Sequence, residues 1–272
     1  MNQATLAAPV AFEGVGLHTG AAVRVELRPA PEDSGLVFAL GDDGFAIPAL
    51  AEYVTETSRA TVVGRDGRSV STVEHLLSAL FGLGVTNATI AVSGPEIPVL
   101  DGSGKRFVEL IDGVGLAPQP VARKTMRLHE PYFVRDGDRM IAAFPSDGFR
   151  VRFLADFPAP VGTQYYDGAM NASIYRNDIC GARTFGYLRE VEALRARGLA
   201  QGGSLENAIV FDENGPMRPL RWANEVVRHK VLDLLGDFAL LGAWPQFDVV
   251  AIKSGHALHA AAALALRKGA RP

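Results

Sequence analysis

The sequence has one cysteine, no long apolar run and no excess of positive charge. Cys180 cannot form an internal disulfide and cannot build a thiolate metal site by itself, which favours a reducing compartment. No apolar run approaches the length that crosses a bilayer, and residues 1–14 lack the basic start and apolar core of a secretory signal. The net charge of −3 argues against a general nucleic-acid-binding surface. We expect a cytoplasmic protein with no nucleic-acid partner and no stable membrane insertion.

The length of 272 residues suits one large domain or two ordinary ones, each with its own core. Spacing of apolar residues predicts strands and helices in both halves, without the regular alternation of a doubly wound sheet. Residues 113–124, rich in glycine and proline, are the predicted linker. We find no residue-level repeat and no low-complexity segment apart from the alanine-rich tail at 260–265. The sequence therefore predicts two α+β domains. The predicted strands are at 22–27, 87–92, 125–129, 140–144 and 149–157. The predicted helices are at 106–111, 187–197 and 222–241, with one more that begins near residue 74.

Polar residues recur every fourth position in the predicted helix at 222–241. His229, Asp233 and Asp237 thus lie along one stripe, where an imidazole and a carboxylate one turn apart can share a metal ion. A solvated polar face is the common alternative explanation of such a stripe. Glu74 and His75 can take different roles around one centre, but the spacing of Glu74 from a serine three residues earlier also fits a helix capping box.

Six segments, in this order and across nearly the whole chain, resemble UDP-3-O-acyl-N-acetylglucosamine deacetylases. They are GVGLHTG at 14–20, STVEHLLSAL at 71–80, PEIPVLDGSG at 95–104, ARTFGYLREVEALRARGLAQGGSLENAIV at 182–210, RHKVLDLLGD at 228–237 and KSGHAL at 253–258. The resemblance implies removal of an acetyl group from an acylated UDP-glucosamine in lipid A biosynthesis. We expect the chain to be a monomer. The resemblance also implies two α+β domains, 1–122 and 123–272, each a sheet packed on helices, with the active site in the cleft between them and an acyl-passage insert near 184–208.

The same resemblance implies a catalytic centre that holds one Zn²⁺ per chain, or Fe²⁺ in its place. The zinc ligands would be His75, His229 and Asp233, which leaves the open position that catalytic zinc needs. Four residues would carry the chemistry of amide hydrolysis. Glu74 would be the general base, His256 the acid near the leaving amine, Thr184 a donor to the oxyanion, and Asp237 the partner that orients His256.

Six further residues would bind the substrate by the same resemblance. Phe185, Lys230 and His18 match positions that hold the sugar and the diphosphate. Leu188, Val191 and Leu194 would line a passage for the acyl chain, although their spacing alone would equally suit an ordinary core. The chain departs from some relatives in having Ala60 where they have a cysteine that can add a zinc ligand, so a thiolate-blocked state is not expected.

Two other functions compete with this prediction. A non-catalytic nucleotide-sugar-binding protein would need none of the proton-transfer groups that accompany the three predicted ligands. An iron oxygenase with two histidines and one carboxylate would need no glutamate beside a metal-binding histidine. The sequence thus favours a metal-dependent hydrolase.

Overall fold

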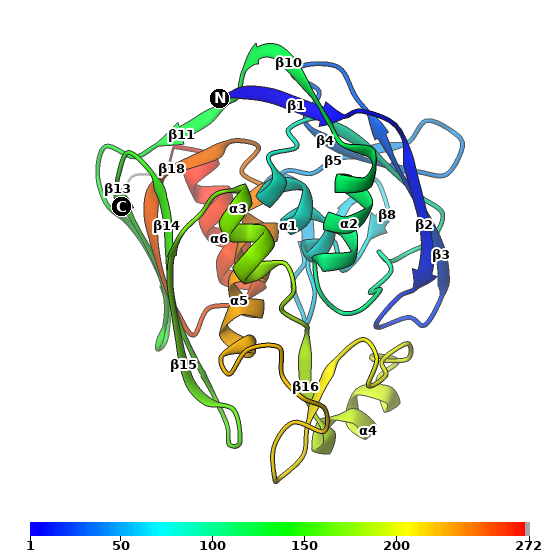
Figure 1. Ribbon diagram of the computed structural model, residues 1–272, viewed down its shortest axis with the longest axis vertical. Helices are drawn as coiled ribbons and strands as arrows, with labels where there is room; N and C mark the ends of the chain where they lie inside the picture. Colours follow the sequence, from blue (N-terminus) through cyan, green and yellow to red (C-terminus); the bar gives the residue numbers. More distant parts are fainter. Residues whose placement is uncertain (270–272) are drawn as a thin grey trace.

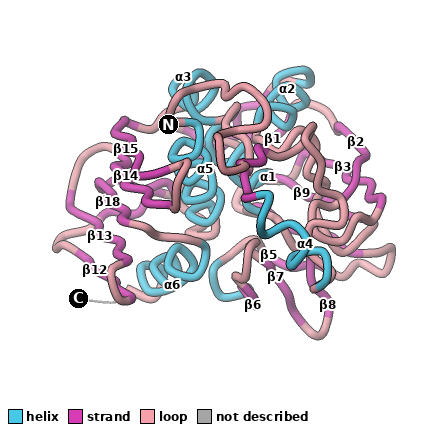
Figure 2. Tube along the Cα trace, turned by 90° about the horizontal axis from the view of Figure 1, so that it is seen from below, coloured by secondary structure: helices cyan, strands magenta, loops and turns pink. Residues whose placement is uncertain are grey.

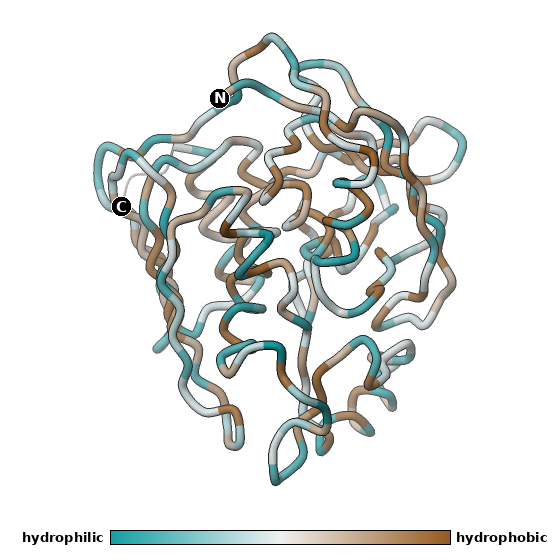
Figure 3. The backbone as a smooth tube through the Cα atoms, viewed as in Figure 1, coloured by the Kyte–Doolittle hydropathy of each residue, from teal (hydrophilic) through white to brown (hydrophobic). Residues whose placement is uncertain are grey.

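Two mixed β-sheets stand on either side of a central group of helices in the computed structural model, which describes residues 1–269 (Figures 1 and 2). The predicted α+β class is confirmed. Apolar residues concentrate along the central helices and the strands that face them (Figure 3), because strands with one covered face alternate buried and more exposed positions. In β14 and β18, for example, every second residue is buried over most of the strand.

The first sheet comes from the N-terminal half and has the strand order β2-β3-β9-β4-β5. Its last strand in the sequence, β9, lies in the middle, antiparallel to β3 and parallel to β4. The bounds are β2 (Val10–Val15), β3 (Ala22–Pro29), β4 (Leu36–Leu40), β5 (Ala46–Pro48) and β9 (Ala88–Val92).

The second sheet comes from the C-terminal half and has the order β12-β13-β18-β14-β15, with β11 parallel to β18. Again the last strand, β18, lies in the middle, antiparallel to β13 and parallel to β14. The two sheets therefore repeat one topology that the residue sequence does not reveal. The bounds are β11 (Thr125–Arg127), β12 (Tyr132–Asp136), β13 (Arg139–Pro145), β14 (Phe149–Phe157), β15 (Gly162–Ala169) and β18 (Trp244–Ile252).

Helices α1 (Glu74–Leu83) and α5 (Glu225–Ala239) pack against each other between the sheets. Every residue of α1 is buried, as expected of a helix that is apolar on nearly all sides. The remaining helices are α2 (Lys105–Val114), α3 (Ala172–Ile174), α4 (Leu188–Ala196) and α6 (His256–Arg267), with short helical turns at Ala51–Tyr53 and Tyr175–Ile179. None of the helices within residues 1–269 combines the length and the apolar character that crossing a bilayer requires.

Smaller sheets complete the molecule. The predicted linker at 113–124 is not irregular, because most of it is strand β10 (Leu116–Ala122), antiparallel to β1 (Asn2–Leu6). The alanine-rich tail is part of helix α6, whose apolar side is buried. The other strands are β6 (Val54–Glu56), β7 (Val62–Arg65), β8 (Arg68–Val70), β16 (Phe185–Tyr187) and β17 (Ile209–Phe211). The division into domains at residues 122 and 123 stays a prediction.

Candidate active site

The packing of α1 on α5 brings two imidazoles and one carboxylate together. Nε2 of His75 lies 3.7 Å and Nε2 of His229 lies 3.4 Å from Oδ1 of Asp233, and all three side chains are buried. The potential ligand atoms of these residues lie within 4.8 Å of one another. The stripe on α5 is therefore buried, and its interpretation as a solvated polar face is wrong.

The protonation states of these residues suit a metal ion. Burial lowers the pKa of His75 to about 3 and also lowers the pKa of His229, so both imidazoles are neutral. Burial alone would raise the pKa of Asp233, but the adjacent ammonium group of Lys230 holds it well below its ordinary value. Neutral imidazoles and an ionised carboxylate are the forms in which these side chains bind metals.

The hydrogen bonds of the cluster also fit a metal site. Oδ1 of Asp233 and Nδ1 of His75 are buried without a hydrogen-bond partner, which is uncommon for buried polar atoms. Nδ1 of His229 donates to the Ala182 carbonyl oxygen at 3.1 Å, which leaves Nε2 with a free lone pair facing Asp233. A cation held by Nε2 of both imidazoles and by the carboxylate would give Oδ1 of Asp233 the partner that it lacks.

Glu74 lies at the start of α1 but does not cap the helix. The residue before the helix is Val73, and no side chain accepts a hydrogen bond there. Instead, Oε2 of Glu74 accepts a hydrogen bond from the backbone N–H of Thr61 at 3.1 Å, while Oε1 lies 3.8 Å from Nε2 of His256. Burial raises the pKa of Glu74 to about 7. The capping-box interpretation is therefore wrong, and the carboxyl group is poised to exchange a proton near neutral pH.

His256 begins helix α6 and forms an ion pair with the buried carboxylate of Asp237. Its Nδ1 lies 2.8 Å from Oδ2 of Asp237. Burial alone would lower the pKa of His256, but Asp237 and Glu74 raise it to about 9. His259 lies at the same distance from Oδ2 of Asp237. These three side chains also meet the spacing of a metal site, but here the hydrogen bonds between them already use the atoms that a metal would need.

Close backbone contacts set the geometry of this region. A Cβ at Gly236 would lie 2.0 Å from the carbonyl oxygen of Glu74, so only glycine lets α5 approach α1 at that point.

Three residues beside the site, Arg59, Thr72 and Lys253, have positive φ angles of 68°, 56° and 50°. Such conformations cost of the order of 1 kcal/mol or more for residues other than glycine and are concentrated at functional sites.

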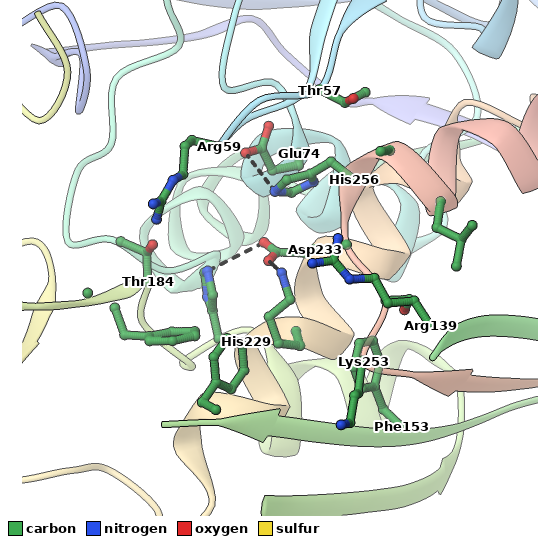
Figure 4. Close-up of a pocket in the computed structure, with 18 of the residues that line it drawn as sticks. Thr57, Arg59, Glu74, Arg139, Phe153, Thr184, His229, Asp233, Lys253 and His256 are labelled. Atoms are coloured by element: carbon green, nitrogen blue, oxygen red, sulfur yellow. Dashed lines mark hydrogen bonds and ion pairs between the residues drawn. The ribbon is translucent and has the colours of Figure 1, made fainter. Parts of the chain in front are cut away.

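A cavity of about 810 Å³ opens over the cluster (Figure 4). Glu74, His75, His229, Asp233 and His256 all line it. On one side the wall carries Arg139 and Lys253, and on the other it carries Thr184 (Figure 4). The cavity thus combines the candidate metal ligands with a neighbouring carboxyl group and imidazole and with cationic side chains, and its volume suits a substrate of small-molecule size.

The structure brings three of the six predicted substrate-binding residues to this cavity, together with the predicted oxyanion donor. Phe185, Lys230 and His18 line it, and so does Thr184. The ring of Phe185 packs edge-on against His229, and Nζ of Lys230 lies 2.7 Å from Oδ2 of Asp233. Burial lowers the pKa of His18, and both its ring nitrogens are buried without a hydrogen-bond partner, which leaves them available to a ligand.

Leu188, Val191 and Leu194 are not among the residues that line the cavity. They lie on α4, where no residue is buried and the side chain of Leu188 is 48% exposed. An ordinary core is therefore the wrong explanation of their spacing. The cavity does reach the segment just before and within this helix, at Tyr187 and Glu190.

A buried carboxylate that no sequence pattern indicated fixes one wall of the cavity. Glu96 is fully buried and accepts hydrogen bonds from the backbone N–H groups of His18 and Thr19 and from the hydroxyl groups of Thr19 and Thr72. A Cβ at Gly16 would lie 2.2 Å from Glu96 Oε2. The motif GVGLHTG therefore needs its second glycine so that the loop can close around this carboxylate.

A second buried carboxylate holds the segment that carries Thr184. Glu225, at the start of α5, is fully buried and accepts hydrogen bonds from the guanidinium and backbone N–H of Arg183 and from the backbone N–H of Arg221. Beside it, the backbone N–H of Thr184 donates to Gly102 O at 2.7 Å. The segment that carries Thr184 is thus attached on both sides. Neither glutamate belongs to a local pattern that would distinguish it from a surface residue.

Comparison with known proteins gives a consistent family assignment. The sequence model of the UDP-3-O-acyl N-acetylglycosamine deacetylase family matches residues 3–268. Three of the most similar relatives are named UDP-3-O-acyl-N-acetylglucosamine deacetylase. The relative from Anaeromyxobacter dehalogenans is 43% identical over 96% of this chain and 85% of its own length. The relative from Myxococcus xanthus is 45% identical over 95% of this chain and 84% of its own length. The relative from Phenylobacterium zucineum is 44% identical over 100% of this chain and 94% of its own length.

Proposed function

The chain belongs to the UDP-3-O-acyl N-acetylglycosamine deacetylase family, and from this we propose that it hydrolyses the N-acetyl group of a UDP-3-O-acyl-N-acetylglucosamine. The products are acetate and the free amine of the sugar. This reaction is an early step of lipid A biosynthesis. One observation carries the proposal: a buried two-histidine, one-carboxylate cluster lines the same cavity as a carboxylate and an imidazole that lie 3.8 Å apart. A protein that only binds a nucleotide sugar needs no such proton-transfer pair, so this alternative is not favoured.

We propose that the cluster of His75, His229 and Asp233 holds one Zn²⁺, a site that can also accept Fe²⁺. Two nitrogens and one carboxylate oxygen are the donors that catalytic zinc prefers. When bound, zinc supplies positive charge that polarises the amide carbonyl and lowers the pKa of the attacking water.

Glu74 takes a proton from the water that attacks the amide carbon. Its Oε2 is occupied by the Thr61 N–H, and its Oε1 faces the cavity near His256. Because burial raises the pKa of this carboxyl group to about 7, it can accept a proton at neutral pH more readily than a solvated glutamate.

His256 gives a proton to the leaving amine. Nδ1 is bound to Asp237, so Nε2 is the atom that faces the reaction. The pKa of about 9 keeps this imidazole protonated at neutral pH. As the C–N bond breaks, the proton moves from Nε2 to the amine nitrogen, and the negative charge of Asp237 stabilises the imidazolium before the transfer.

The remaining cavity residues bind the substrate. The hydroxyl group of Thr184 donates to the oxyanion that forms on the attacked carbonyl, and the ring of Phe185 contacts the sugar. We place the diphosphate beside Lys230 and His18 and toward the cationic wall with Arg139 and Lys253. The acyl chain would leave toward α4, where we propose that Leu188, Val191 and Leu194 line its passage.

We further propose that the two sheets belong to two α+β domains, residues 1–122 and 123–272, with this cavity in the cleft between them. The chain would act as a cytoplasmic monomer. Its substrate is a small molecule, so its function requires neither a nucleic acid nor a membrane-inserted segment.

The sharpest test of the proposed substrate compares two ligands. Purified protein should release acetate from UDP-3-O-acyl-N-acetylglucosamine. It should release acetate much more slowly from the same UDP sugar without the acyl chain. Glu74→Gln and His256→Gln proteins should each lose roughly 100-fold or more in turnover. Equal turnover by these variants and the unmutated protein would refute the assigned roles.

A further inference from the structure

Asp237 is a carboxylate beside the reaction site with a hydrogen-bond donor on each oxygen. It is fully buried, and both its oxygens are occupied. Oδ1 accepts from the hydroxyl group of Thr61 at 2.5 Å, and Oδ2 accepts from Nδ1 of His256 and Nδ1 of His259, each at 2.8 Å. Only one of these donors, His256, reaches the catalytic cavity with its other nitrogen.

The proton positions in this network follow from the chemistry of the partners. An ionised carboxylate only accepts hydrogen bonds, so the nitrogen of His259 that faces Asp237 carries a proton. Burial lowers the pKa of His259 and keeps it neutral, so its Nε2 has a lone pair. The hydroxyl group of Ser254 lies 2.9 Å away and donates to that lone pair. Ser254 thereby fixes the tautomer in which His259 donates to Asp237.

Thr61 connects the two ends of the proton-transfer pair. Its backbone N–H donates to Glu74, its side chain donates to Asp237, and its carbonyl oxygen accepts from Val73, the residue before α1. It is itself fully buried. One residue therefore sets the relative positions of the carboxylate that acts as the base and the carboxylate that orients the acid.

We propose that Thr61 and His259 are positioning residues of the deacetylation reaction, which hold the plane of the Asp237 carboxylate so that it directs Nε2 of His256 toward the amine. A carboxylate held by His256 alone could rotate about its side-chain torsions, and His256 would then rotate with it. With donors on both oxygens, it has one orientation. The inference rests on the proposed function, since it concerns the group that protonates the leaving amine.

Pairs of substitutions separate positioning from simple packing. Thr61→Val keeps the shape and the backbone N–H but removes the hydroxyl group, whereas Thr61→Ser keeps the hydroxyl group. His259→Leu removes the donor, whereas His259→Asn keeps an N–H near the position of Nδ1. Thr5→Val is the matched control, because Thr5 is also buried and its hydroxyl oxygen accepts a hydrogen bond, from Ala30, in another part of the fold.

Steady-state kinetics of acetate release give the first result. Thr61→Val and His259→Leu should lower kcat by roughly 10- to 100-fold, with KM and metal content unchanged. Thr61→Ser and His259→Asn should recover most of the loss, and Thr5→Val should match the unmutated protein. The inference is wrong if Thr61→Val and His259→Leu turn over normally, or if the conservative variants are as slow as the disruptive ones.

Nuclear magnetic resonance of the ¹⁵N-labelled imidazoles gives a result that does not depend on turnover. The Nδ1–H signal of His256 should shift and broaden in Thr61→Val and return in Thr61→Ser. A signal that is unchanged in Thr61→Val would overturn the positioning role. If the unmutated protein released no acetate, the proposed function would be refuted, and this spectrum would still decide whether Thr61 orients His256 through Asp237.

Discussion

Replacing Gly236 with alanine adds one methyl group, which should displace the proposed metal ligands from one another. Gly236 lies on α5 between Asp233 and Asp237, and a Cβ there would be 2.0 Å from the carbonyl oxygen and 2.7 Å from the carbonyl carbon of Glu74 on α1. Ordinary contact begins at 3.4 Å. Alanine at this position therefore forces the two helices apart by more than 1 Å, because both contacting atoms belong to backbone that no side-chain rotation can move.

The displacement acts on the atoms that we propose as metal ligands. His75 moves with α1, whereas His229 and Asp233 move with α5, so the distance of 3.7 Å between His75 and Asp233 increases directly. A misplacement of about 1 Å can cost roughly 100-fold in rate. Overpacking also costs about 1–3 kcal/mol in stability, which exceeds the roughly 0.5–1 kcal/mol that alanine gains over glycine within a helix.

The assay compares Gly236→Ala with Gly113→Ala. Gly113 also lies within a helix, but a Cβ there has no atom within 4 Å, so its substitution should raise stability by roughly 0.5–1 kcal/mol and leave turnover unchanged. Gly236→Ala should lose stability, bound metal and about 100-fold in turnover. Full metal content and normal turnover in Gly236→Ala would refute the claim that the approach of α1 and α5 sets the site.

Three other predictions follow from the site. His75→Ala and His229→Ala proteins should purify without the divalent metal, and full metal content in both, measured by elemental analysis, would remove them from the ligand set. The rate should follow a bell-shaped pH profile, because Glu74 must lose a proton and His256 must keep one. The alkaline limb of the profile should lie near the pKa of His256, which is about 9. The acid limb should lie at or below the pKa of Glu74, which is about 7, because a bound cation lowers the pKa of a neighbouring carboxyl group. A flat profile would contradict both roles. Val191→Asp should weaken inhibition by a hydroxamate with a long apolar tail, because burial of that tail contributes roughly 0.8 kcal/mol per methylene. Inhibition by acetohydroxamate and the metal content should stay unchanged. Equal weakening of inhibition by both compounds would place Val191 outside the passage.

Local patterns predicted the elements that carry the chemistry. The four-residue spacing of His229, Asp233 and Asp237 placed them on one stripe of a helix, and the structure has that stripe on α5. The fully buried helix α1 was found from a run of apolar residues. Both predictions depend on intrahelical geometry, which the sequence alone determines to a useful degree.

Contacts between distant segments could not be predicted in this way. Thr61 is 176 residues from Asp237 in the sequence, and Glu96 is 78 residues from His18. Nothing in the local sequence distinguishes these residues from ordinary polar ones, because burial and partners come only from the assembled fold. The capping box at Glu74 failed for the same reason: its carboxylate accepts a hydrogen bond from Thr61 on a different segment.

The repeated sheet topology was also beyond the sequence. The strand orders β2-β3-β9-β4-β5 and β12-β13-β18-β14-β15 are equivalent, yet the buried positions are occupied by different apolar residues. Many apolar sequences of similar volume can fill the same positions of a sheet. A shared topology therefore leaves no residue-level repeat to detect.

Metal-dependent release of acetate tests the central claim most directly. Purified protein is treated with a chelator, supplied with UDP-3-O-acyl-N-acetylglucosamine, and then restored with one equivalent of Zn²⁺ while acetate is measured. The account predicts that acetate release stops after chelation and returns with zinc, and that zinc restores nothing in the Glu74→Gln protein. Undiminished acetate release after the metal has been removed completely would contradict it.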